Sequence, residues 1–486
     1  MFANDRQRML DQIAWGIGTS DTEFIETWKY SPNSSPPYRV RFGKLTDANV
    51  DDWLRQRAEY APPSPPTDAK VIGGLRLILS ERGFYRPLSF SLSKESYLRI
   101  EDEFHLPEAT LPGLADEGGS CSRYDDYAED GDAKPSRIAF VIRAFQKYQV
   151  ANYGLAVSFD FKTGFSTGIL HGTGVVNSEL DFLLWPKTPS AELFDAIEAS
   201  AVMSAEPLYL PVILLQHHLY RTKVFCTVHM ENDYNRIQAQ LGTTRAGRLH
   251  TMGEYQDPVG NKTINEARVG LRNLTGELST FMTESIWFCR ISDWHVEYIN
   301  FLSDAFEHVS KKAGRPQEDE QRKIRDAIEY LRTSVQGLKR CTGGAKERAA
   351  VDFTVLYNLT AQLDNRLNAK ISASASRDSM AMKVLAFITT FFLPGTFVAT
   401  LFSMDMFNWQ GSASAEPSSG AVVSPYLWIY WAVTVPLTII VAFSWRMWWT
   451  WEKGNFDRDV RMEIENIEAP STWDLRKGGG QRATQR

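Results

Sequence analysis

The chain has 486 residues, a net charge of −6 and 43% hydrophobic residues. This length allows about three domains, and so modest a charge argues against a nucleic-acid partner. The four cysteines are far apart in the sequence, so they predict neither a CxxC metal knuckle nor a disulfide framework. With no phosphate-binding P-loop and no HExxH zinc helix, we expect no enzymatic activity and no cofactor.

Residues 1–250 predict an α/β domain. Apolar runs typical of strands lie at Arg137–Arg143, Gly154–Asp160 and Gly168–Leu170. Helical patterns lie at Pro189–Ala205 and Pro211–Leu241. Four prolines between residues 62 and 66 predict a stiff or disordered connector, and residues 116–132 predict an acidic, glycine-rich loop.

Residues 251–345 predict antiparallel helices that pack on a stalk helix at 346–383. Apolar residues recur at helical spacing in Thr263–Val309 and again in Glu318–Arg340, and the segment between them contains Gly314 and Pro316, which end helices. No proline or glycine follows Lys346 until Pro394, so one helix of about 57 residues could continue from the stalk into the next segment.

Two uncharged apolar segments, 384–402 and 426–445, lie near the C-terminus. Each has about the 20 residues that a helix needs to cross a membrane. Basic residues flank the pair on the outside, whereas the loop 403–425 contains none, so we expect both chain termini, including the basic tail 446–486, on the cytoplasmic side. A buried helical hairpin in a soluble protein is the alternative.

Hydroxyl side chains lie on one face of the first apolar segment. Thr389, Thr396, Thr400 and Ser403 are separated by seven, four and three positions, which places them in one narrow sector of a helix. Such a stripe serves either as a packing seam between membrane helices or as a pore wall that offers partners to a hydrated ion.

The first segment resembles the pore helix of the CorA family of divalent-cation channels. The similar residues are Met382-Lys383 at its start, Pro394-Gly395-Thr396 in its middle and Ser403-Met404-Asp405 at its end. In that family the last three positions are Gly-Met-Asn, so this chain differs at two of them. The resemblance is strongest to divergent fungal members and covers about the last hundred residues before the tail.

The resemblance implies a homo-oligomer, expected to be a pentamer, in which this helix lines a pore. It places a hydrophobic constriction at Leu385 and the polar cytoplasmic entrance at Ser379, where Asp378 could substitute as a charged group. At the external mouth it places Ser403, Met404 and Asp405. A ring of Asp405 carboxylates would concentrate cations there and contact the transported metal.

The sequence therefore predicts a two-pass membrane protein, expected in the plasma membrane, with a CorA-like fold. The predicted function is passive transport of divalent cations, Mg²⁺ first, as substrate. The alternative is a membrane-anchored scaffold or sensor that keeps the oligomeric architecture without conducting, which the changes at Ser403 and Asp405 favour.

Overall fold

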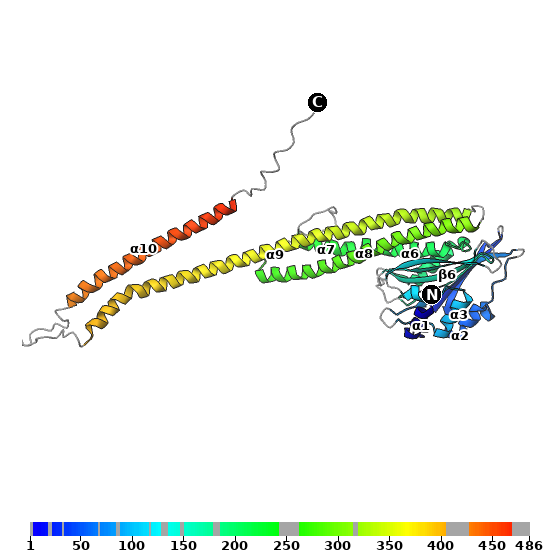
Figure 1. Ribbon diagram of the computed structural model, residues 1–486, viewed down its shortest axis with the longest axis horizontal. Helices are drawn as coiled ribbons and strands as arrows, with labels where there is room; N and C mark the ends of the chain where they lie inside the picture. Colours follow the sequence, from blue (N-terminus) through cyan, green and yellow to red (C-terminus); the bar gives the residue numbers. More distant parts are fainter. Residues whose placement is uncertain are drawn as a thin grey trace, which may run out of the picture. The chain divides into compact units, whose positions relative to one another are not determined.

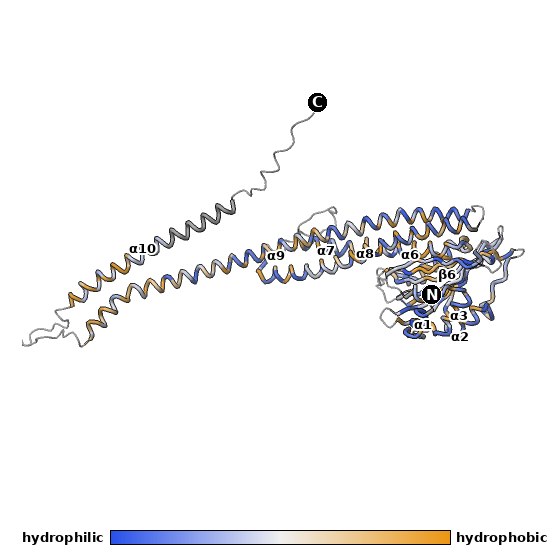
Figure 2. Tube along the Cα trace, viewed as in Figure 1, coloured by the Kyte–Doolittle hydropathy of each residue, from blue (hydrophilic) through white to orange (hydrophobic). Residues whose placement is uncertain are grey.

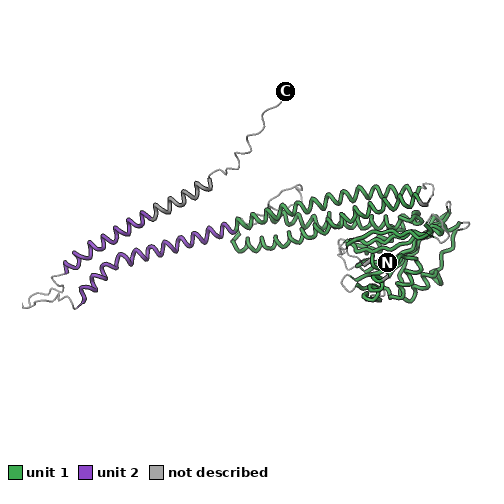
Figure 3. The backbone as a smooth tube through the Cα atoms, in the orientation of Figure 1, with its two compact units in different colours: residues 1–363 green, residues 364–486 purple. Residues whose placement is uncertain are grey.

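A computed structural model describes residues 3–17, 22–31, 34–66, 69–83, 88–115, 118–127, 135–145, 150–177, 185–242, 262–313, 319–404 and 427–468. The chain forms two compact units, residues 1–363 and 364–486 (Figure 3). The predicted fold class is confirmed, because an N-terminal α/β domain is followed by long helices and two C-terminal apolar helices (Figure 1).

The first unit contains a seven-stranded sheet in the order β2-β1-β3-β7-β6-β5-β4. Every neighbouring pair is antiparallel except β3 and β7, which run parallel. The strands are β1 Thr22–Tyr30, β2 Tyr38–Leu45, β3 Val71–Glu81, β4 Ser120–Tyr127, β5 Pro135–Arg143, β6 Asn152–Asp160 and β7 Phe165–Thr173. The predicted strands over 137–143 and 154–160, and the one beginning at 168–170, correspond to β5, β6 and β7.

Both faces of the sheet are buried. Leu75, Leu77 and Leu79 of β3 point into one core, while Ile78 between them points into the other, as the two-residue period of a strand requires. Helices α1 Ala3–Gln12, α2 Asp47–Leu54, α3 Lys94–Glu103 and α4 Thr110–Ala115 cover the face of Ile78 (Figure 1). Helices α5 Pro189–Ala199 and α6 Tyr209–Val224 cover the other face. Two short 3-10 turns, Ala58–Tyr60 and Ala201–Met203, also belong to this unit.

Long helices extend the first unit. A π-helical turn, η3 Phe225–Met230, joins α6 to α7 Glu231–Leu241, and α8 Ile264–Ala313 and α9 Asp319–Phe402 follow. Apolar residues of η3, α7, α8 and α9 form a third core, to which Met230, Phe281 and Leu356 belong. Tyr234 of α7 donates a hydrogen bond of 2.6 Å to the Asp352 carboxylate of α9, so these helices also share a buried polar contact.

Two features of this unit differ from the sequence prediction. Residues 120–127 form the edge strand β4 instead of part of an acidic loop, because β5 supplies backbone partners to a segment with few apolar residues. The predicted helix over 318–340 is not a separate antiparallel element, since it continues through Gly343 and Gly344 into the stalk within α9. Each helical glycine costs only about 1 kcal/mol, and burial of neighbours such as Leu338 and Ala349 outweighs it.

The second unit contains the end of α9 and the helix α10 Leu427–Glu468. The first predicted span ends where α9 ends, at Phe402. Helix α10 instead continues well beyond the predicted end at 445, because the following residues include no proline before Glu468. The predicted domain boundary at residue 250 and most of the loop 403–425 lie outside the described residues.

Candidate functional site

Helices α9 and α10 each contain a stretch long and apolar enough to cross a membrane. Figure 2 shows the hydrophobic residues gathered in the last part of α9 and the first part of α10. Only 11% of the most apolar stretch of α9 and 6% of that of α10 is buried. A hairpin in the core of a soluble protein would be mostly buried, so within the described chain these apolar surfaces are not accounted for by the protein interior.

The two apolar helices contact each other along one seam within the second unit. The Tyr430 hydroxyl donates to the main-chain carbonyl of Gly395 at 3.4 Å. Phe387 and Trp445 lie with their ring centroids 5.0 Å apart. Val398 of α9 and Thr434 of α10 are buried. These contacts fix which face of α9 is turned toward α10.

The threonine stripe lies beside this seam: its side chains are exposed, and Thr396 and Thr400 line a groove together with residues of α10. Val398 is two positions from both Thr396 and Thr400, which is about 200° around a helix. Thr389, Thr396 and Thr400 are all exposed, as is Ser403 at the helix end. The prediction that these four hydroxyls share one face agrees with the helix. The two interpretations of the stripe, as a packing seam between membrane helices or as a pore wall, both stay predictions.

The threonine hydroxyl hydrogens are bonded within α9. Thr389 Oγ1 donates to the Leu385 carbonyl at 2.9 Å, Thr396 Oγ1 to that of Leu393 at 3.0 Å and Thr400 Oγ1 to that of Thr396 at 2.9 Å. Each oxygen therefore keeps lone-pair capacity for a partner outside the helix. The stripe presents hydrogen-bond acceptors, which suit a cation or its hydration water.

An open groove borders part of the stripe. Thr396 and Thr400 line it with Leu393 on the α9 side, Leu437 and Val441 line it on the α10 side, and its volume is about 490 Å³. Its walls are almost entirely apolar side chains. The groove can therefore hold an apolar group beside the hydroxyls, such as a side chain of another helix.

The predicted constriction and entrance residues lie on the same helix. Leu385 is 64% exposed, and Asp378 and Ser379 are exposed as well. Asp378 lies 11 positions before Thr389, so the two residues share one face of the helix. Ser379, the next residue, is turned about 100° away from Asp378. The roles given to Leu385, Asp378 and Ser379 stay predictions.

The predicted external mouth is described only in part. Ser403 and Met404 follow α9 in a turn, where the Ser403 amide donates to the Ala399 carbonyl at 3.0 Å, and both side chains are exposed. Asp405, the predicted metal-contacting residue, lies outside the described residues. Its role stays a prediction.

Sequence analysis missed two contacts that hold this site together. The Lys383 ammonium lies 5.0 Å from the centre of the Trp449 ring, a cation–π contact between α9 and α10. The second is the Gly395–Tyr430 hydrogen bond. Small residues near Gly395 and aromatic residues near Tyr430 are visible in the sequence, but which of them meet depends on the register of the two helices.

One enzyme-like motif is also present. Residues 164–168 read Gly-Phe-Ser-Thr-Gly, the spacing of a serine nucleophile elbow. Ser166, however, lies inside β7 and is buried, whereas an elbow needs the serine in a tight turn between a strand and a helix. This motif therefore does not form a nucleophile elbow.

Comparison with known proteins adds three likenesses. A stretch of 79 residues is 37% identical to Notoamide biosynthesis cluster protein M' of Aspergillus versicolor, and the match spans 16% of either chain. The CorA magnesium transporter of Methanocaldococcus jannaschii aligns over 87% of this chain and 97% of its own, with 12% identity and a TM-score of 0.33. The full-length CmaX protein aligns over 90% of this chain and 99% of its own, with 14% identity and a TM-score of 0.33. No protein-family model matches the chain.

Proposed function

We propose that the protein is an integral membrane protein that moves divalent cations, Mg²⁺ first, passively through a pore lined by α9. The observation that carries this proposal is the exposed row of acceptor oxygens at Thr389, Thr396 and Thr400, on an apolar helix that packs on α10 through other residues. Mg²⁺ gives up its water reluctantly, and hydroxyl oxygens can accept hydrogen bonds from that water without stripping it.

A single α9 cannot surround a path, so the proposal requires several copies. Leu385 and Met382 lie near the same face as the threonines and are 64% and 72% exposed. Burial of these side chains against neighbouring copies would account for their exposure in one chain. We propose a homo-oligomer, a pentamer as in the family that the sequence resembles, with Leu385 as the constriction and Asp378 and Ser379 at the cytoplasmic entrance.

The membrane potential would drive the ions inward. With both chain termini in the cytoplasm of a cell whose interior is negative, each elementary charge gains about 2.3 kcal/mol per 100 mV, and a divalent ion gains twice that. Asp405 would concentrate cations at the external mouth. The plasma membrane is the location in which this direction of flux supplies the cell.

Reconstituted flux tests the proposal. The purified chain is placed in liposomes that enclose a Mg²⁺-sensitive dye, its oligomeric state is measured in the same detergent preparation, and a potential is imposed. Wild type is expected to conduct as an oligomer and Asp405→Ala to conduct less. A monomer would refute the pore. An oligomer without flux would refute transport and leave the alternative, a non-conducting scaffold or sensor, which the departures at Ser403 and Asp405 favour.

A further inference from the structure

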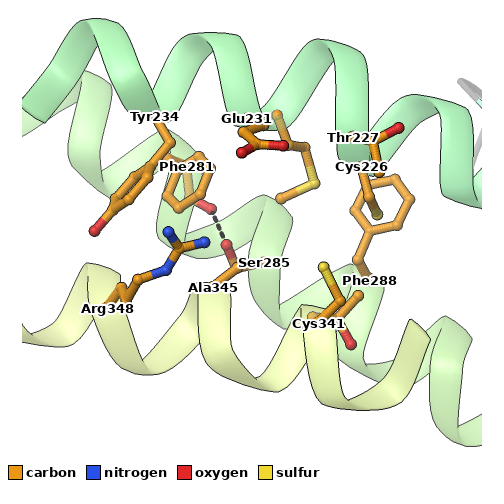
Figure 4. Close-up of a pocket in the computed structure, with 12 residues that line it drawn as sticks. Cys226, Thr227, Glu231, Tyr234, Phe281, Ser285, Phe288, Cys341, Ala345 and Arg348 are labelled. Carbon is orange, nitrogen blue, oxygen red and sulfur yellow. Dashed lines mark hydrogen bonds between the residues drawn. The ribbon is translucent and has the colours of Figure 1, made fainter. Parts of the chain in front are cut away.

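A cavity in the first unit brings together sulfur atoms from distant parts of the sequence. It has a volume of about 200 Å³ and lies between η3, α7, α8 and α9. Cys226, Met230 and Cys341 all line it. Figure 4 shows the Cys226 and Cys341 side chains pointing toward each other from opposite helices. The cavity is far from the apolar segments in sequence, and the proposed transport does not use it.

The local backbone explains why the sulfurs converge. Cys226 and Met230 are four positions apart in the π-helical turn η3, so both side chains project from one side of it. Such π turns are rare and are frequent at functional sites. Cys341 comes from α9, which packs on η3 through the third core. Two thiols and one thioether therefore share one small space.

The surroundings suit a soft ligand set. Phe281 and Phe288 form apolar walls of the cavity, and Met230 is 4% exposed. An ion that binds the Cys226 sulfur as a thiolate must displace its proton. Cys341 is on the exposed side, which gives an ion a way in.

Hard or borderline metals are a poor match. Within the described part of the chain, no group of three or more His, Cys, Asp or Glu side chains is arranged to hold a metal ion. Zinc sites typically use four such ligands, and Mg²⁺ needs oxygen ligands in octahedral geometry. Two cysteines with a methionine are instead the thiolate and thioether set that selects Cu(I).

We propose that Cys226, Cys341 and Met230 form a binding site for one Cu(I) ion. Binding forms two copper–thiolate bonds and one copper–thioether contact, and the two thiol protons leave to solvent, so copper stays monovalent and no electron is transferred. The complex carries one net negative charge. The Arg348 guanidinium and the Glu231 carboxylate both line the same cavity, and the guanidinium lies 4.9 Å from the Tyr234 ring centre.

A competition titration tests this site. The full chain in detergent is titrated anaerobically with Cu(I) held by the chromogenic chelator bicinchoninate. Wild type is expected to withdraw one equivalent. Because loss of even a supporting group costs about 10–100-fold in metal affinity, Cys226→Ser and Cys341→Ser are each expected to lose at least that much. Met230→Leu, which keeps the apolar packing, is expected to bind more weakly than wild type but more tightly than either serine variant.

Matched controls come from the other two cysteines. Cys121→Ser and Cys289→Ser are expected to bind as wild type does, and size-exclusion profiles check that every variant stays folded. The site is refuted if wild type withdraws no copper, or if Cys226→Ser and Cys341→Ser bind like wild type. It is also refuted if Cys289→Ser abolishes binding. Since no flux is measured, failure here leaves the proposed pore untouched, and failure of flux leaves this site untouched.

Discussion

The Tyr430 hydroxyl donates a hydrogen bond to the main-chain carbonyl of Gly395, at 3.4 Å, across the two apolar helices. This contact needs a small residue at position 395 rather than glycine itself. A Cβ built there would lie 3.6 Å from Thr434 Cγ2 and 3.7 Å from Tyr430 Oη, which are ordinary contact distances. The pair therefore sets the face of α9 that packs on α10 and, with it, the face that stays exposed.

Gly395→Leu is expected to loosen this seam, whereas Gly395→Ala is expected to be tolerated. A single added carbon fits at the distances above, but the further carbons of leucine overlap α10, and overpacking of this kind costs about 1–3 kcal/mol. Thermal unfolding in detergent measures the difference. Ala432→Leu, at an exposed position of α10, serves as the control. Equal melting temperatures for the two Gly395 variants would show that the seam does not depend on close approach.

Thr396→Val and Thr400→Val are expected to lower cation flux without lowering stability. Valine keeps the shape of threonine, and the lost hydroxyl hydrogen bond is local to α9, so the change in unfolding free energy should stay within about 1 kcal/mol. If each variant loses one hydrogen bond of about 1 kcal/mol between the threonine oxygen and the water shell of the ion at the highest point of the energy barrier to permeation, flux falls by roughly fivefold.

The matched control for these variants is Thr438→Val in α10. Its hydroxyl also donates within its own helix, to the Thr434 carbonyl at 2.8 Å, but it belongs to the helix that does not line the proposed pore. Liposome flux assays compare the three variants. A fall in flux for Thr438→Val as large as for Thr396→Val would argue against a pore on the threonine face.

The sequence predicted those elements whose signal is local. Strands β5 and β6 are continuous apolar runs, and the threonine stripe follows from helical periodicity alone. Edge strand β4 was missed because Ser120–Tyr127 does not show the alternation of apolar and polar residues that marks a strand. Its structure comes from pairing with β5, in which Tyr124 lies opposite Ala139. The merging of two predicted helices into α9 was missed because Gly343-Gly344 resembles a helix end when its packing is unknown.

In the candidate site, too, the sequence predicts features with a local signal but not those that depend on tertiary packing. Periodicity places Thr389, Thr396 and Thr400 together, but which face of α9 meets α10 depends on contacts between residues far apart in the chain, such as Gly395 with Tyr430. Likewise, Cys226 and Cys341 are too distant in sequence to form a motif. They meet only because η3 and α9 pack in the third core.

Glu26→Gln is expected to destabilise the first unit strongly. The Glu26 side chain is fully buried in β1, where its carboxylate pairs with Arg76 at 3.0 Å and with Arg41 at 2.5 Å. Removing its charge leaves the buried Arg76 guanidinium uncompensated, which costs about 3–5 kcal/mol. Asp51→Asn is the control, since the partly exposed Asp51 pairs with Arg55 and should cost about 1 kcal/mol or less. Chemical denaturation measures both, and similar losses would contradict this account.

Acid is expected to destabilise the first unit through a buried histidine pair. His218 Nδ1 and His295 Nε2 lie 2.8 Å apart between α6 and α8, and both side chains are fully buried. Burial lowers the pKa of His218 well below its usual value, with the neighbouring His295 adding to the effect, and burial lowers the pKa of His295 to about 3. His295 is therefore neutral in the folded protein at pH 5, and His218 takes up a proton less readily in the folded protein than in the unfolded chain, where both rings are protonated below about pH 6.5.

The sign of the pH dependence follows from that difference. The unfolded chain binds more protons below about pH 6.5, so the free energy of unfolding falls as the pH drops toward 3, by up to about 1.4 kcal/mol per pH unit for each histidine. His295→Gln removes one such group and should flatten the slope between pH 6.5 and pH 4.5. His229→Gln, at a side chain that is 49% exposed, should leave the slope as in wild type. Denaturation of the three proteins across this range measures the slopes, and an unchanged slope for His295→Gln would show that the pair does not stay neutral in the folded state.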